Sequence, residues 1–187
     1  MGDTGDETPS ATSLLQAAQA GAKGKGPPPV HLWNPPYCGE IDIVIKRDGT
    51  WIHEGTPIGR PGLVRLFASI LKLEEGRHFL VTPVEKVGIT VEDAPFVAVD
   101  VEASDGIVAF RTNVGDVVEA GPDHPIRVPM AGDGEPSPYV EVRSGLEALI
   151  DRKSFYRLVE MGEEEDGWFG IRSHGTFFRV IEAAKLE

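Results

Sequence analysis

The segment Thr82–Phe96, TPVEKVGITVEDAPF, combines the pattern of a β-strand with several charged side chains. Side chains alternate between the two faces of a strand, so Val87, Ile89 and Val91 are predicted to share one face. Glu85 falls on this apolar face, where an unpaired carboxylate is costly. It therefore needs an arginine partner or a ligand that donates a hydrogen bond to it.

Other residues of this segment also suit a binding site. Lys86 and Gly88 lie on the opposite face, and the glycine would let a ligand or another backbone approach closely. Asp93 precedes Ala-Pro, a position where its side chain can hold a turn. The structural alternative is that Glu85 and Lys86 form an ion pair at the end of a strand and that Asp93 is only a turn residue.

Arginines occur twice with the same spacing, at Arg60 and Arg65 and at Arg152 and Arg157. Five positions on a helix correspond to about 140° around its axis, so the two members of a pair cannot serve one ligand. We assign Arg60 and Arg152 to the loop before a helix or to its first turn, where the helix dipole also favours an anion. We expect Arg65 and Arg157 to cover the helix flank or to pair with an acid, and a salt bridge is the structural alternative for all four.

Composition limits the class of function. The chain has 187 residues and a net charge of −12, so it suits one domain or two small ones and lacks the basic surface that nucleic-acid binding needs. Cys38 is the single cysteine, and no Cys-His cluster has zinc-site spacing, so we expect neither a metal nor another cofactor. The N-terminus is acidic and no long apolar segment follows, so we expect a cytoplasmic protein without a membrane span.

The elements that position these residues are mainly short strands. Residues 1–29 are rich in Gly, Ala, Ser, Thr and Pro and are predicted to be a flexible leader, in which Ser13–Ala20 forms a helix only on docking. IDIVIKR and TWIHE flank Asp48-Gly49, which predicts a β-hairpin. Apolar spacing predicts a helix over 60–73, and short strands return from Arg77 onward. The predicted class is α+β with a mostly antiparallel core.

A repeat divides this core. IDIVIKRDG is matched by PYVEVRSG, IGRPGLVRLF by IDRKSFYRLV, and GRHFLV by GWFGIR. A strand-turn-helix-strand unit therefore occurs twice, which predicts two related subdomains over residues 30–95 and 96–187. Clefts between domains are favoured places for small ligands, so we expect a site between the two halves.

Long motifs of the chain resemble a known family. WNPPYCGEIDIVIKRDGTWIHEGTPIGRPGLVRLFASIL, LVTPVEKVGITVEDAPF, FRTNVGD, HPI and PYVEVRSGLEALIDRKSFYRLVE are similar to the bacterial DUF1285 family of unknown function, from Trp33 to the C-terminus. The resemblance implies a duplicated α+β core whose C-terminal half is similar to pleckstrin-homology folds. It also implies a nucleotide-like ligand at the interface of the halves and a signalling role, but no reaction. The ligand-site candidates carried over from its motifs are Trp33, Asp48, Arg60, Glu85, Lys86, Asp93, Asn113, His124, Arg143 and Arg152.

These candidates suit an anionic ligand that carries a ring. The cations that could neutralise a phosphate are Arg60, Lys86, Arg143 and Arg152. Trp33 or Tyr139 could stack on the ring, and the side chains that could bond its edge are Glu85, Asp93 and Asn113. The structural alternatives are core packing for Trp33 and a turn role for His124, which lies between Asp123 and Pro125.

Three functions follow from these observations. The favoured one is a cytoplasmic ligand-binding module that senses a small anionic, nucleotide-like or phosphate-bearing molecule in signal transduction. The second is a hydrolase of such a molecule that uses Glu85 or Asp93 with His124, but the chain has no recognised nucleophile motif and no metal-carboxylate cluster. The third is a scaffold that docks a protein partner, with which the predicted flexible leader is consistent.

Overall fold

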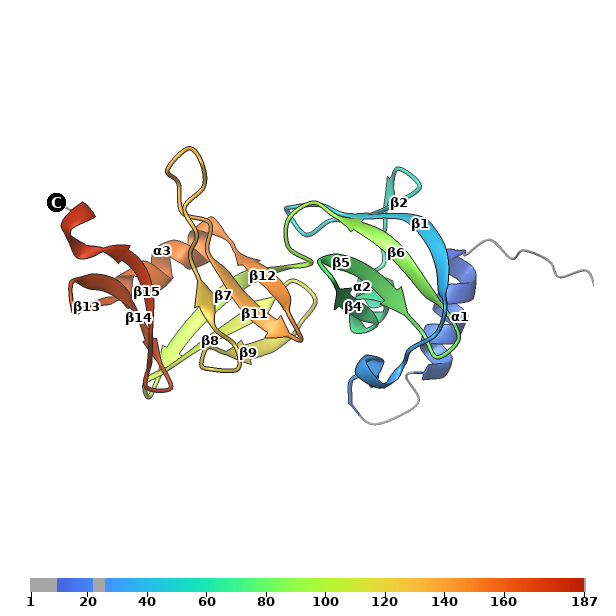
Figure 1. The fold of residues 1–187 in the computed structure, drawn as a ribbon, viewed down its shortest axis with the longest axis horizontal. Coiled ribbons are helices and arrows are strands. Elements are labelled where there is room, and N and C mark those ends of the chain that lie inside the picture. Colours follow the sequence, from blue (N-terminus) through green and yellow to red (C-terminus); the bar gives the residue numbers. More distant parts are fainter. Residues whose placement is uncertain (1–9, 22–25, 187) are drawn as a thin grey trace, which may run out of the picture. The chain divides into compact units, whose positions relative to one another are not determined.

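The computed structural model describes residues 10–21 and 26–186 and divides into two compact units (Figure 1). The first unit comprises Met1–Lys46 and Thr50–Glu92, and the second comprises Arg47–Gly49 and Asp93–Glu187. Both are built mainly of short strands with few helices, which confirms the predicted α+β class. Within the described residues, none of the helices has the length and apolar character needed to cross a bilayer.

The first unit contains one six-stranded sheet. Its strands are β1 (Tyr37–Ile45), β2 (Trp51–His53), β3 (Thr56–Pro57), β4 (Leu71–Glu74), β5 (Arg77–Val81) and β6 (Lys86–Val91), in the order β3-β2-β1-β6-β5-β4. Ile43 pairs with His53 across β1 and β2, which confirms the predicted hairpin. All neighbours are antiparallel except β1 and β6, which run parallel.

Helix α2 (Pro61–Ser69) begins with proline at its first position, as predicted. It ends before the predicted limit at residue 73, because Leu71–Glu74 leave the helix and form β4. Leu71 pairs with Leu80 on β5, and both side chains are buried. Leu71–Glu74 continue the apolar spacing of the helix, but their pairing with β5 holds them in a strand. Tertiary pairing here overrides the local pattern.

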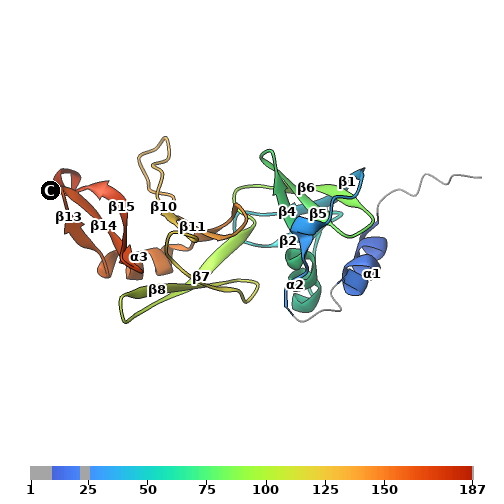
Figure 2. The ribbon, with the colours of Figure 1, turned by 60° about the horizontal axis from the view of Figure 1, so that its bottom comes forward.

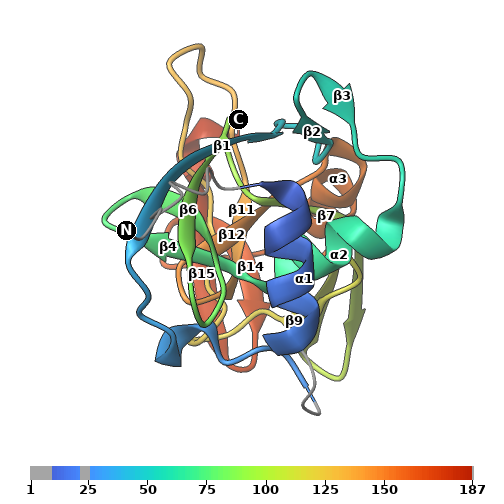
Figure 3. The ribbon, with the colours of Figure 1, turned by 90° about the vertical axis from the view of Figure 1, so that its right-hand side faces the viewer.

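A second helix, α1 (Ala11–Gly21), lies across α2 (Figure 3), and η1 (Val30–Leu32) is a short 3₁₀ turn. Leu14 and Ala18 of α1 are fully buried. Residues 11–21 therefore form the helix that was predicted for Ser13–Ala20 on docking, here against α2, and do not behave as a flexible leader. A short helix gains stability from a tertiary partner, and burial of its apolar side chains offsets the entropy of ordering. Residues 1–9 and 22–25 lie outside the described residues.

The second unit contains two sheets and helix α3 (Arg152–Glu160) (Figure 2). The larger sheet has the order β10-β11-β12-β7-β8-β9, and the smaller has the order β13-β14-β15. The strands are β7 (Phe96–Ser104), β8 (Ile107–Thr112), β9 (Val117–Glu119), β10 (Ile126–Arg127), β11 (Tyr139–Arg143), β12 (Leu146–Ile150), β13 (Glu163–Glu165), β14 (Trp168–Ser173) and β15 (Thr176–Glu182). A second 3₁₀ turn, η2 (Ala183–Lys185), follows β15. Val101 and Phe110 face each other across β7 and β8 in the buried core.

Both units contain a hairpin, a nine-residue helix and a three-stranded meander in the same order. In each meander, the turn before the middle strand consists of an acidic residue followed by glycine. These residues are Glu75-Gly76 and Asp166-Gly167, and all four have positive φ. These elements coincide with the sequence repeat. Their sheets close differently, because β6 runs parallel to β1 in the first unit, whereas β12 runs parallel to β7 in the second.

Candidate anion-binding pocket

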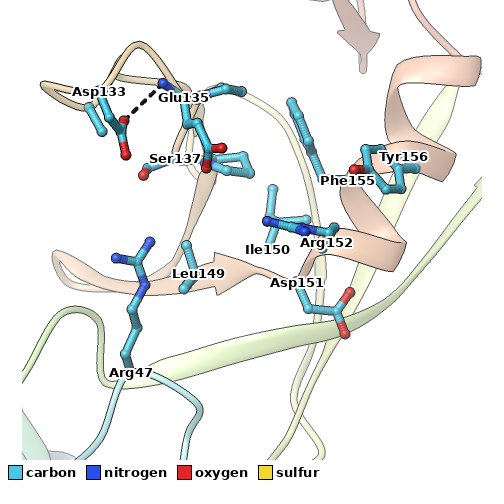
Figure 4. A pocket seen from close by; sticks show the side chains of 13 residues that line it. Arg47, Asp133, Glu135, Ser137, Leu149, Ile150, Asp151, Arg152, Phe155 and Tyr156 are labelled. Atoms are coloured by element: carbon cyan, nitrogen blue, oxygen red, sulfur yellow. Dashed lines mark hydrogen bonds between the residues drawn. The ribbon is translucent and has the colours of Figure 1, made fainter.

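The second unit has a cavity of about 610 Å³ beside the N-terminus of α3 (Figure 4). Its walls come from the loop between β10 and β11, the end of β12, the first turn of α3 and Arg47. The charged residues that line it are Arg47, Asp133, Glu135, Asp151 and Arg152. Ser137 and Tyr156 add hydroxyl groups, and the apolar part of the wall includes Leu149, Ile150 and Phe155.

Asp151 connects β12 to α3 and fixes the geometry of this end of the pocket. Its backbone N–H donates to the carbonyl of Ala98 at 3.0 Å, and its Oδ1 accepts the N–H of Ser154 at 2.8 Å. This side-chain contact is an N-cap, which aspartate favours. The Asp151 carboxylate is thereby held away from the cavity, whereas Arg152, the first residue of the helix, is directed into it (Figure 4).

The charges of the pocket differ in how far they are compensated. Arg47 lies 3.7 Å from the Asp93 carboxylate and its side chain is 61% exposed. Arg152 is also exposed, but it has no ion pair or hydrogen bond to its side chain within the described residues. The Asp151 carboxylate caps this helix end and offsets the positive end of the helix dipole, so the guanidinium of Arg152 is the positive group at this end of the pocket. This end of the pocket is therefore suited to an anion.

Two aromatic side chains from the first turns of α3 complete the wall. Phe155 is half-buried, and Tyr156 is 61% exposed. Aromatic faces of this kind can stack on a planar ring of a ligand. The pocket thus has a cationic end and an apolar, aromatic side, both supplied by one short helix.

Of the predicted ligand residues, Arg152 is the one that lines this pocket. Asp93 is used in the fold, because the Tyr139 hydroxyl donates to its two carboxylate oxygens at 2.8 and 3.0 Å. Burial and the neighbouring Asp93 carboxylate raise the pKa of Tyr139. Tyr139 is buried and its ring is covered by the guanidinium of Arg127 at 4.7 Å, so it offers no open stacking surface.

Asn113 and Arg143 also make structural contacts in the second unit. Asn113 Oδ1 accepts the backbone N–H of Val97 at 3.0 Å. Arg143 donates to Asp116 at 3.1 Å and lies over the ring of Phe96 at 5.1 Å. Asp48 is exposed in the turn between β1 and β2 and does not line the cavity.

His124 lies at a second hollow of the same unit, of about 500 Å³, together with His174. Its Nδ1 is 3.0 Å from the carbonyl oxygen of Glu141, and Gly121 pairs with His124 across a tight turn. These contacts favour the turn role. In the described part of the chain, no three His, Cys, Asp or Glu side chains are grouped so as to hold a metal ion.

The remaining candidates lie in the first unit. Lys86 donates to Glu74 at 2.8 Å, and Glu85 precedes β6 in a turn, where its carbonyl accepts the backbone N–H of Thr82. Glu85 therefore lies outside the strand whose apolar face it was predicted to share. Arg60 is exposed at the N-cap of α2, which confirms its predicted place at the start of a helix.

Trp33 is half-buried and packs in the first unit. A Cβ atom at Gly21 would lie only 2.8 Å from its ring, and its carbonyl accepts a hydrogen bond from Lys72 at 3.1 Å. The close approach to α1 favours the packing alternative for this residue. Arg157 was predicted to cover the helix flank or to pair with an acid. It pairs with Asp100 at 2.5 Å, so the second of these alternatives holds.

Sequence reasoning missed most of the pocket wall. Arg47 carried one usable signal, because it occupies the place in IDIVIKRDG that Arg143 occupies in PYVEVRSG, the Arg-x-Gly ending of the repeated strand. Phe155 and Tyr156 follow Arg152 in a predicted helix and could have been considered with it. The loop carboxylates of Asp133 and Glu135 lie in a stretch that has only the composition of a turn.

Comparison with known proteins agrees with this architecture. The family model described as domain of unknown function (DUF1285), N-terminal domain, matches residues 28–94, and the model for the C-terminal domain of the same family matches residues 95–180. The comparison with curated proteins found no match.

Two solved structures are similar to the chain. The crystal structure of a DUF1285 family protein from Silicibacter pomeroyi DSS-3 has 62% identity and a TM-score of 0.86, and the match covers 92% of this chain and 97% of that one. A DUF1285 family protein from Shewanella baltica OS155 has 31% identity and a TM-score of 0.52, over 63% of this chain and 90% of that one. The chain therefore belongs to the DUF1285 family, with the N-terminal domain of that family followed by its C-terminal domain.

Proposed function

We propose that the protein is a ligand-binding module whose second unit takes a small anionic molecule with a ring, such as a nucleotide-like or phosphate-bearing compound. Occupancy of the pocket beside α3 would then be the event that is sensed in signal transduction in the cytoplasm. The family name and the solved relatives assign no activity, so the proposal rests on the pocket.

The observation that carries the proposal is the uncompensated guanidinium of Arg152. The chain has 30 acidic residues and 18 lysines and arginines, so carboxylates are abundant. Arg152 nevertheless lines a cavity without an ion-pair partner among the residues that the structure describes. Arginine binds carboxylate and phosphate groups through a planar fork of donors, which makes it well suited to anchor such a ligand.

The rest of the wall fits the same class of ligand. Phe155 and Tyr156 supply aromatic surface on the same short helix as Arg152. A cavity of about 610 Å³ lies within the range typical of small-molecule sites. We do not propose a hydrolase, because Asp93 and His124 are each engaged in contacts that maintain the fold.

Isothermal titration calorimetry with a panel of nucleotides, sugar phosphates and inorganic phosphate tests the proposal. The informative variant is Arg152→Ala, and Lys153→Ala is its matched control, since Lys153 is the next residue of α3 and does not line the cavity. Loss of a charge-assisted hydrogen bond costs about 1.5–3 kcal/mol, so we expect Kd to rise about 10- to 100-fold in Arg152→Ala alone. An equal loss in both variants, or a wild-type protein that binds no member of the panel, would overturn the proposal.

A further inference from the structure

We infer that the ligand of this pocket carries an amino group at a distance from its anionic group. The inference rests on the proposed function and names the chemical class of ligand more closely. It comes from the loop between β10 and β11, which forms the wall of the cavity that faces the first turn of α3 (Figure 4).

The loop is held by its own hydrogen bonds. The N–H of Ala131 donates to the carbonyl of Glu135 at 2.8 Å, and the N–H of Ser137 donates to the carbonyl of Pro129 at 2.9 Å. Asp133 Oδ1 accepts the backbone N–H of Glu135 at 3.0 Å, so one loop carboxylate is used to shape the turn. These contacts place Glu135 on the wall of the cavity, with its carboxylate directed into the hollow (Figure 4).

Glu135 and Arg152 line the same cavity without neutralising each other. In the residues that the structure describes, neither side chain has an ion pair or hydrogen bond, and the two are held on separate elements, the loop and α3. Glu135 and Arg152 therefore form a negative and a positive pole of the pocket, to which Arg47 and the engaged carboxylates of Asp133 and Asp151 also contribute charge. A ligand that carried only negative charge would satisfy Arg152 and be repelled by Glu135, because like charges in one site oppose each other.

The chemistry of a carboxylate decides which ligands complement this second pole. An ionised carboxylate accepts hydrogen bonds and donates none, so it matches an amine or an amino group on a ring. A carbonyl oxygen in the same place would set an acceptor against an acceptor, and such a mismatch is a source of specificity. The pocket should thus prefer an amino-bearing anion to an otherwise identical anion with a carbonyl group.

Two pairs of mononucleotides provide matched probes. Adenosine and inosine monophosphate differ in an amino group against a carbonyl at the same ring position, and so do cytidine and uridine monophosphate; in each pair the neighbouring ring nitrogen also changes from an acceptor to an N–H donor. We expect calorimetry to show that wild-type protein binds the amino member of each pair about tenfold more tightly. In Glu135→Gln the ratio should fall towards one while the carbonyl member still binds, because an amide both donates and accepts.

Glu160→Gln is the control for net charge, since Glu160 is exposed at the far end of α3 and does not line the cavity. We expect this variant to keep the wild-type ratio. Equal affinities for the two members of each pair in wild-type protein would overturn the inference and leave the proposed anion site standing. An equal loss of preference in both Gln variants would also overturn it. Wild-type protein that binds no mononucleotide would overturn the inference, and it would overturn the proposed function as well if no sugar phosphate or inorganic phosphate binds either.

Discussion

The ammonium nitrogen of Lys86 on β6 lies 2.8 Å from the Glu74 carboxylate on β4, across the intervening strand β5. Lys72 lies 3.1 Å from the other carboxylate oxygen, and the ring of Phe79 on β5 lies beneath the Lys86 ammonium at 4.9 Å. The lysine in the charged strand segment is therefore part of an ion-pair network within the sheet. Because its charge is already compensated, we exclude Lys86 from the proposed anion site.

This network predicts a dependence of stability on acid pH. The hydrogen bond from Lys86, followed by that from Lys72, lowers the pKa of Glu74 below its usual value of 4.5. A carboxyl whose pKa is lower in the folded state stabilises the fold above its unfolded pKa, and this contribution is lost as the pH falls through the lowered value. We expect Glu74→Gln to be less stable than wild type at neutral pH and the difference to close below about pH 4.5. Urea unfolding across this range measures it, and a difference that stays constant with pH would contradict the assignment.

His78 on β5 predicts a second pH effect at milder acidity. Burial lowers the pKa of this half-buried imidazole below its usual value of 6.5. The unfolded state then binds the proton more readily, so stability is complete above about pH 6.5 and declines as the pH falls below it. Unfolding free energies should show that His78→Gln removes this decline. The exposed His31→Gln serves as the control, and a decline that persists in His78→Gln would argue against this origin.

The packing of α1 predicts that its apolar residues stabilise the first unit. Leu14 is fully buried, whereas Leu32 is 72% exposed. Removing a buried leucine side chain leaves a cavity and costs about 2–5 kcal/mol, so Leu14→Ala should lower the free energy of unfolding by about this amount. Leu32→Ala should change it by less than about 0.5 kcal/mol. If the two variants had equal stability in urea unfolding, α1 would not be a stable part of the unit.

The contact between Tyr139 and Asp93 predicts a cost for losing one hydroxyl group. The Tyr139 hydroxyl bonds both oxygens of Asp93, and hydrogen bonds to a charged group contribute about 1.5–3 kcal/mol. We expect Tyr139→Phe to lose stability of this order in thermal and urea unfolding. Tyr156→Phe is the matched control, because that side chain is 61% exposed. A loss of the same size in the control would refute a specific role for the Asp93 contact.

Gly170 on β14 predicts a backbone clash on substitution. A Cβ atom at this position would lie 2.3 Å from the carbonyl oxygen of Phe178 on the neighbouring strand β15. Backbone atoms cannot turn aside as a side chain can, so we expect Gly170→Ala to cost about 1–3 kcal/mol. At Gly132 a Cβ would meet nothing within 4 Å, and Gly132→Ala should be close to neutral in the same unfolding assay. If Gly170→Ala and Gly132→Ala lowered the free energy of unfolding equally, the result would be inconsistent with the clash.

Local patterns predicted much of the fold. Alternating residues around a turn predicted the hairpin of β1 and β2, and proline followed by apolar spacing predicted the start of α2. The repeated motifs predicted a strand-turn-helix-strand unit that occurs twice, and each unit of the structure contains these elements in that order. These features depend on residues that are near neighbours in the chain, and their physical causes act over a few positions.

Longer-range pairing was not accessible to such reasoning. The helix predicted as far as residue 73 ends earlier because β4 pairs with β5. Helix α1, which contacts α2, buries Leu14 and Ala18. The partner of Lys86 was likewise unpredictable, because Glu74 is 12 positions away along the chain. Such partners depend on which strands lie side by side in the sheet. The spacing of residues within one segment does not specify that order.

The candidate site also has one part that local sequence patterns predicted and one part that depends on tertiary packing. The sequence by itself placed Arg152 at the start of a helix, because IDRKSFYRLV matches IGRPGLVRLF and this match depends only on neighbouring residues. Only the tertiary structure decided that this guanidinium shares a cavity with Arg47 and Glu135, which come from distant parts of the chain. The reason is that a charge is compensated by whatever the fold brings within a few ångströms of it, and that distance is set by packing.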